Sequence, residues 1–119
     1  MTEIQALLLI KSILESADIH GIENILAEDC EYMSTGRGII GRNRNESIEF
    51  LSSMTESIKA DNVPVTCKVM HITDVYEEDA LFHAGRHGLT VSYESGDNYV
   101  YMIFVDVNDE GLVDRIVSS

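Results

Sequence analysis

Hydrophobic residues near the N-terminus recur at the spacing of an α-helix. Ile4, Leu7 and Leu14 fall on one wide apolar face together with their aliphatic neighbours. Thr2 followed by Gln5 has the spacing of a capping box, in which a hydroxyl and an amide bind the first backbone groups of a helix. The pattern predicts a first helix that starts after Thr2 and is buried over most of its circumference.

The next segments are shorter. Asp18 can cap a second, short helix, in which Ile22, Ile25 and Leu26 keep helical spacing. Residues 30–34 then favour a brief strand. The sequence therefore predicts two helices before the first strand.

A third helix is well marked at both ends. Asn43 with Glu46 favours its start, and it should stop near Asp61 because Pro64 would be costly inside a helix. Residues 35–44, with three glycines and three arginines, are predicted to be the longest irregular segment.

After Pro64 the pattern becomes that of β-strands. Residues 65–76, 80–93, 99–107 and 112–117 are strand-like, and polar turns of three or four residues separate them. Such short turns join antiparallel neighbours, since a parallel return needs a dozen or more residues. The whole order predicts an α+β fold, with three helices on one face of a mainly antiparallel sheet.

Length and charge narrow the possible partners. The 119 residues predict a single domain over residues 1–119. A net charge of −13 argues against nucleic acid and against anionic membranes as partners.

Cys30 and Cys67 are too few for a disulfide framework and are expected to be reduced thiols. The apolar run at 6–10 is too short to span a membrane, so a cytoplasmic protein is expected.

One motif match is expected to be incidental. Gly36 to Gly41 fits the G-x-G-x-x-G pattern of dinucleotide-binding proteins, between a predicted strand and a predicted helix. A dinucleotide fold needs further alternation of strands and helices, which the pattern after Pro64 does not provide. We interpret the glycines as turn residues and predict no cofactor.

The predicted strand at 80–93 carries the least ordinary pattern of the chain. His83, His87 and Leu89 share one face, with a glycine between the histidines, which predicts the wall of a pocket. Four residues along a strand span about 13 Å, so these two histidines cannot bind one metal ion, and no metal site is predicted. They are the candidate catalytic acid–base groups, with His71 a weaker candidate. Hydrogen-bonded histidines that line a half-wet cavity are the alternative.

Polar residues on other strands can reach the same pocket. Tyr32 and Ser34 share a face of the first strand, and Tyr99 and Tyr101 share a face of the strand at 99–107. Together with Leu89 they are the predicted ligand-binding residues. Phenol hydroxyls on an apolar wall can donate to a carbonyl or enolate oxygen. Core aromatics whose hydroxyls reach water or backbone are the alternative.

Four stretches of the chain resemble the nuclear transport factor 2-like superfamily, which includes ketosteroid isomerase, scytalone dehydratase and the SnoaL-like polyketide cyclases. They are residues 18–25, 27–32, 40–42 and 106–111. The resemblance covers essentially the whole chain. It implies a cone-shaped fold, in which the curved sheet wraps around the helices and leaves an apolar pocket at the open end.

Departures from the family patterns bear on the activity. Ketosteroid isomerase needs a carboxylate base where this chain has Ser34, a tyrosine near the position of Ile13, and an aspartic acid in the 100–103 stretch, and this chain has none of them. That mechanism is therefore not supported. Scytalone dehydratase pairs histidines with tyrosines, which leaves its chemistry open for His83 and His87.

Three functions are consistent with the sequence. The resemblance implies a SnoaL-like protein that binds a small hydrophobic ligand. A dehydratase, isomerase or cyclase that uses histidine and tyrosine as acid and base is the first alternative. A dimeric interaction module is the second, because family members commonly pair through the sheet. Phe82, Ala84 and Arg86, on the face opposite the histidines, would suit a homodimer interface.

Overall fold

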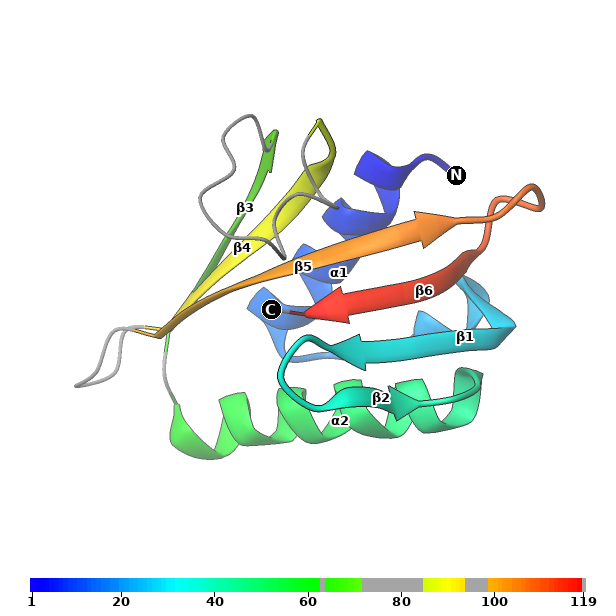
Figure 1. Cartoon of the computed structure of the whole chain (residues 1–119). Helices are drawn as coiled ribbons and strands as arrows, with labels where there is room; N and C mark the ends of the chain where they lie inside the picture. The colour runs from blue at the N-terminus through cyan, green and yellow to red at the C-terminus, as the bar shows by residue number, and fades with distance from the viewer. Residues whose placement is uncertain (63, 72–84, 94–98, 119) are drawn as a thin grey trace.

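The computed structural model describes residues 1–62, 64–71, 85–93 and 99–118, and Figure 1 shows their arrangement. The elements in chain order are α1 (Glu3–Ser16), the 3₁₀ turn η1 (Ile22–Asn24), β1 (Leu26–Ser34), β2 (Gly38–Gly41), α2 (Arg44–Asp61), β3 (Val65–His71), β4 (His87–Tyr93), β5 (Tyr99–Val107) and β6 (Val113–Ser118).

The six strands form one mixed sheet in the order β2-β1-β6-β5-β4-β3. Every neighbouring pair is antiparallel except β1 and β6, which run parallel. The predicted α+β class and the mainly antiparallel sheet are confirmed. The bounds of β5 agree with the predicted strand at 99–107.

Side-chain caps start both α-helices where the sequence predicted. Both hydrogen bonds of the capping box between Thr2 and Gln5 form at the start of α1. At the start of α2, the Asn43 side chain accepts a hydrogen bond from the backbone N–H of Glu46. α2 ends at Asn62 in the left-handed conformation, two residues before the proline that cannot continue a helix.

The predicted second α-helix is wrong. The Asp18 carboxylate accepts from the backbone N–H of His20, which closes a local turn instead of capping a helix. Gly21 then adopts a left-handed φ of 87°, and only the 3₁₀ turn η1 follows. The chain therefore holds two α-helices in the described residues, where three were expected.

The first two strands also differ from the prediction. β1 begins at Leu26, four residues before the predicted strand, and the segment predicted to be irregular contains β2. Two of the four residues of β2 are glycines, which weaken a strand, so the pairing with β1 stabilises it. The predicted strand segments at 72–76 and 80–84 lie outside the described residues.

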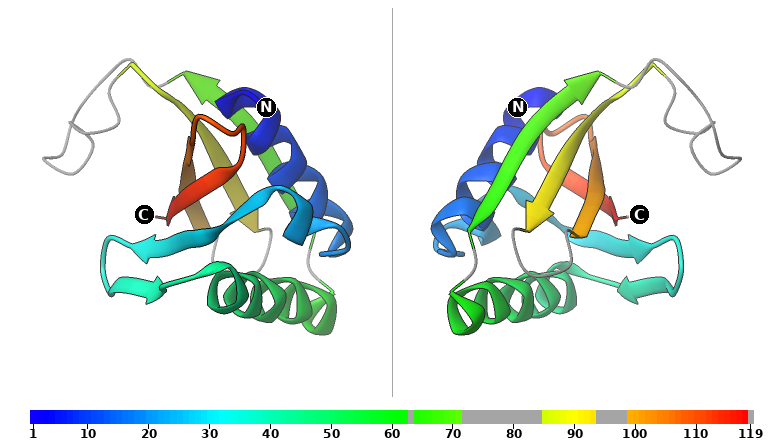
Figure 2. Two further views of the ribbon diagram at one scale, coloured as in Figure 1. Left: turned by 90° about the vertical axis from the view of Figure 1, so that its right-hand side faces the viewer. Right: turned by 90° about the vertical axis from the view of Figure 1, so that its left-hand side faces the viewer.

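Alternation along the strands separates an inner face, on which the helices pack, from an outer face. α1 packs on β3, β4 and β5, whereas α2 packs on β1 and β2, as Figure 2 shows. The inner face and the helices share one hydrophobic cluster. Its strand residues include Tyr32, Cys67, Leu89, Val91, Tyr101, Ile103, Val105 and Ile116.

α1 is less buried than the sequence predicted. Only one stripe of it faces the sheet, and Ile4, Leu8 and Leu9 remain 41–48% exposed on its other side. The reason is that α1 lies along one side of the sheet and α2 does not enclose it. Across the described residues, no helix is long and apolar enough to cross a membrane.

The glycines of the G-x-G-x-x-G motif have structural roles. Gly38 opens β2 with a φ of 80°. Gly41 lies against the first turn of α2, where an added Cβ would stand 2.9 Å from the backbone nitrogen of Ser47. An added Cβ at Gly36 would meet nothing within 4 Å. The motif therefore serves a hairpin and the close approach of β2 to α2.

We predict that Gly41→Ala destabilises the protein by about 1–3 kcal/mol, because the backbone of Ser47, as well as its hydroxyl, opposes the new methyl group. The matched control is Gly36→Ala, which should change the free energy of unfolding by less than about 0.5 kcal/mol. Urea unfolding followed by circular dichroism measures both. Equal effects would show that the contact between β2 and α2 is not close-packed.

Candidate functional site

Tyr32 is completely buried on the inner face of β1. Its ring lies 4.6 Å from that of Phe50, between centroids, and its hydroxyl donates to the Met54 thioether sulfur at 3.7 Å. Phe50 and Met54 both come from α2 and are only half-buried. The phenol is thus covered by two side chains that themselves reach solvent.

Three of the other predicted ligand-binding residues lie on the same face. Leu89 is fully buried, and Tyr101 is nearly so, opposite Val91 of β4. Ser34, at the end of β1, is half-buried. Tyr99 begins β5, but its side chain lies outside the described residues, as does all of His83.

His87 shares its face with Leu89, as the alternation predicted, but its neighbours were not predicted. Its backbone N–H donates to the Glu3 carboxylate at 3.1 Å. Its ring lies 5.1 Å from the ring of His71, between centroids. His71 is directly opposite it in the register of β3 and β4, and its Nε2 lies 3.2 Å from the carbonyl oxygen of Gly85.

Arg86 connects three elements. Its guanidinium donates to the Asp106 carboxylate of β5 at 2.7 Å and to the carbonyl oxygen of Val105, and its Nε lies 3.8 Å from the Glu3 carboxylate of α1. The sequence placed Arg86 with Phe82 and Ala84 at a dimer interface. In the structure the Arg86 guanidinium is paired with two carboxylates of the same chain. Phe82 and Ala84 lie outside the described residues.

The structure therefore divides the predicted site residues into two groups. Among the described residues, His87 contacts Glu3 and His71, whereas Tyr32 contacts Phe50 and Met54. The sequence missed His71 as the partner of His87. If the two strands beside the predicted turn at 77–79 are paired symmetrically, His71 falls opposite Gly85. That position is two residues away from its actual partner, His87.

The two cysteines are free and buried, as expected for reduced thiols. Burial raises the pKa of Cys30 to about 12, partly offset by the Ser47 side chain. Burial also raises the pKa of Cys67 to about 11, with a contribution from Glu15. Neutral thiols are poor nucleophiles and poor metal ligands, so these residues are structural.

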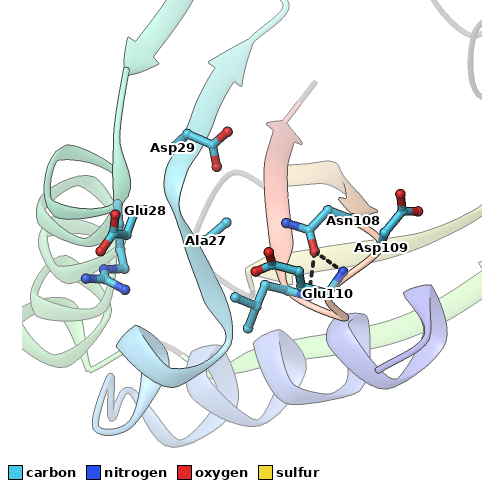
Figure 3. A pocket seen from close by; sticks show the side chains of 8 residues that line it. Ala27, Glu28, Asp29, Asn108, Asp109 and Glu110 are labelled. Atoms are coloured by element: carbon cyan, nitrogen blue, oxygen red, sulfur yellow. Dashed lines mark hydrogen bonds between the residues drawn. The ribbon is translucent and has the colours of Figure 1, made fainter.

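An open polar cavity of about 660 Å³ lies elsewhere, between the start of β1, the start of α2 and the turn after β5 (Figure 3). Its lining residues are Ala27, Glu28, Asp29, Arg44, Asn108, Asp109, Glu110 and Leu112. The Asn108 side chain accepts from the backbone N–H groups of Glu110 and Leu112, which holds the turn in shape. None of the predicted site residues lines this cavity.

A smaller cavity of about 210 Å³ lies between the end of α1 and η1, and His20 is among its lining residues. No group of three or more metal-ligating side chains is found within the described part of the chain.

No family model and no curated protein matches the chain. Solved structures do match it over nearly its whole length. An LEH-like epoxide hydrolase of M. tuberculosis is 17% identical, with a TM-score of 0.62 over 98% of this chain and 80% of that one. The epoxide hydrolase/cyclase-like enzyme SalBIII of salinomycin pyran ring formation is 14% identical, with a TM-score of 0.61 over 99% and 92%.

A nuclear transport factor 2-like protein of unknown function from Mesorhizobium loti is 13% identical, with a TM-score of 0.64 over 99% of this chain and 93% of that one. The chain has the nuclear transport factor 2-like fold. The resemblance noted in the sequence is confirmed at the level of the fold, and identities this low say nothing further about activity.

We predict that a disulfide reagent such as DTNB modifies native Cys30 and Cys67 at least about a hundredfold more slowly at pH 8 than it modifies the urea-unfolded chain. The raised pKa values also affect stability. The folded thiols keep their protons up to about pH 11–12, whereas unfolded thiols ionise from their ordinary value of 9.0. Stability should therefore fall as the pH rises above 9. Labelling of the native chain as fast as that of the unfolded chain would show that burial does not protect Cys30 and Cys67.

Proposed function

We propose that the chain binds a small, largely apolar molecule between the inner face of the sheet and α2, beside Tyr32. The observation that carries the proposal is the burial of the Tyr32 phenol beneath Phe50 and Met54. A thioether is a weak hydrogen-bond acceptor, and methionine is flexible, so a ligand oxygen can replace it at the hydroxyl.

The surrounding surface suits such a ligand. Leu89 and Val91 supply an aliphatic wall, and Tyr101 adds a second phenol on the same face. Ligand sites of this kind are mostly apolar with a few polar groups that fix orientation. We propose Tyr32 and Tyr101 as these polar groups, with Ser34 at the end of β1 as a further one; Tyr99, also predicted, has its side chain outside the described residues.

Turnover is the second candidate function. Two matching structures are described as epoxide hydrolase-like or cyclase-like enzymes, which is compatible with chemistry in the same interior. Against it stands the strand order, which puts β6 and β5 between Tyr32 of β1 and His87 of β4, because acid–base catalysis needs both groups at one substrate. We therefore favour binding, with a tyrosine as the hydrogen-bond donor.

We also propose that the outer face of the sheet pairs two copies of the chain. One row of cross-strand neighbours on that face is apolar over all six strands. It consists of Ile39, Met33, Val117, Phe104, Gly88 and Met70. Ile39 and Met70, at its two ends, are each 42% exposed. Its middle residues Val117, Phe104 and Gly88 are buried within the chain, so a contact between two copies would use the exposed ends of the row.

We predict that Tyr32→Phe weakens binding of a neutral apolar ligand about tenfold, the worth of one hydrogen bond of about 1.4 kcal/mol. The ligands to test are small ketones and epoxides, in competition with Nile red, whose fluorescence reports occupancy of an apolar site. Thr90→Val is the matched control, because it removes one hydroxyl from the outer face. Undiminished binding by Tyr32→Phe, or no binding by the wild type, would exclude the proposed site.

For the dimer, we predict that Ile39→Lys combined with Met70→Lys shifts the chain from dimer to monomer in light scattering at micromolar concentration. The control is Ile4→Lys combined with Leu8→Lys, which charges an equally exposed apolar surface on α1 and should leave the dimer intact. A monomeric wild type, or a dimer lost only in the control, would contradict an interface on the sheet.

A further inference from the structure

Neither the fold nor the proposed ligand site explains why His71 and His87 lie side by side. They face each other across β3 and β4, the edge pair of the sheet, on the inner face. Their rings are tilted by 56° with centroids 5.1 Å apart. His71 is exposed and His87 is half-buried, so the pair can be reached from solvent.

We propose that His71 and His87 together bind a divalent transition-metal ion of the Zn²⁺, Ni²⁺ or Cu²⁺ class. Imidazole nitrogen is a ligand that these ions share. Metal–nitrogen bonds of about 2.0–2.1 Å at a near-tetrahedral angle place two ring centroids about 5 Å apart. The observed separation of 5.1 Å meets this requirement without movement of the backbone.

A hydrogen bond prepares one of the two ligands. The Gly85 carbonyl oxygen, 3.2 Å from Nε2 of His71, can only accept, so Nε2 carries the proton. The lone pair of His71 is then on Nδ1, for which no hydrogen bond is found among the described residues, and it can bind the ion. Metal-binding histidines commonly donate their other ring N–H to a carbonyl in this way, which fixes the tautomer and the ring orientation.

The local charge also favours a cation. The Glu3 carboxylate accepts from the backbone N–H of His87. The neighbouring Arg86 guanidinium is paired with Asp106 and with Glu3, so two carboxylates offset its positive charge. The chain as a whole carries a net charge of −13, which raises the local concentration of cations.

The pair provides two protein ligands. Since the described residues hold no cluster of three or more ligating side chains, water or a second molecule completes the coordination. A two-ligand ion with open positions binds reversibly and can accept an anionic or neutral donor. The contacts of this pair involve Glu3 and Gly85, whereas those of Tyr32 involve Phe50 and Met54 of α2.

Calorimetric titration of the protein, purified without a histidine tag, with Zn²⁺ and separately with Ni²⁺ tests the proposal. We expect one ion per chain, with affinity lowered at least tenfold by His71→Ala and by His87→Ala. The double variant should bind no more weakly than either single one, since the two ligands act as a unit. His20→Ala, which removes an exposed histidine near η1, is the matched control and should bind as the wild type does.

A second measurement remains informative if either variant fails to fold. In the wild type, substoichiometric Cu²⁺ should broaden the ring proton resonances of His71 and His87 before those of His20. Three outcomes would overturn the proposal: no heat of binding, undiminished affinity in both single variants, or equal broadening of all three histidines.

Discussion

The alternation of side chains along β5 is the constraint on which the rest of the structure depends. β5 pairs with β6 on one side and β4 on the other, and its inner residues Tyr101, Ile103 and Val105 are all buried. A register slip of one residue would exchange the two faces and expose this set. Because the strand is fixed in this way, its neighbours are fixed as well. Leu89 must face inward opposite Ile103, and Phe104 must lie over Gly88 on the outer face.

The two helices cover different halves of the inner face. α1 packs on β3, β4 and β5, and Arg86 ties its first turn to β5 through Glu3 and Asp106. α2 packs on β1 and β2. The surroundings of His87 are therefore set by α1 and those of Tyr32 by α2. This division is why one expected pocket became two groups of residues with different chemistry.

The two groups differ in what they can bind. The phenol of Tyr32 lies in an apolar interior under side chains that can move, which suits a molecule with a hydrogen-bonding oxygen. His71 and His87 lie on an edge pair of strands beside carboxylates, which suits a cation. Cys30 and Cys67 serve neither group, because burial keeps both thiols protonated near neutral pH.

The sequence alone determined the features that depend on neighbouring residues. The capping box at Thr2, the cap at Asn43 and the stop before Pro64 were all predictable, because each involves groups a few residues apart. The same holds for the face shared by His87 and Leu89, which follows from the period of a strand.

Tertiary structure decided what depends on distant residues. β2 forms because it pairs with β1, and the second helix is lost because a left-handed glycine and a local turn compete with a weak helical pattern. The pairing of His71 with His87 follows from the register of β3 and β4, which is set between the two strands and not by the pattern within either one. Tyr32 and His87 lie apart because the strand order places β6 and β5 between β1 and β4. α2 packs on β1 and α1 packs on β4, and spacing along the chain determines neither the strand order nor this packing.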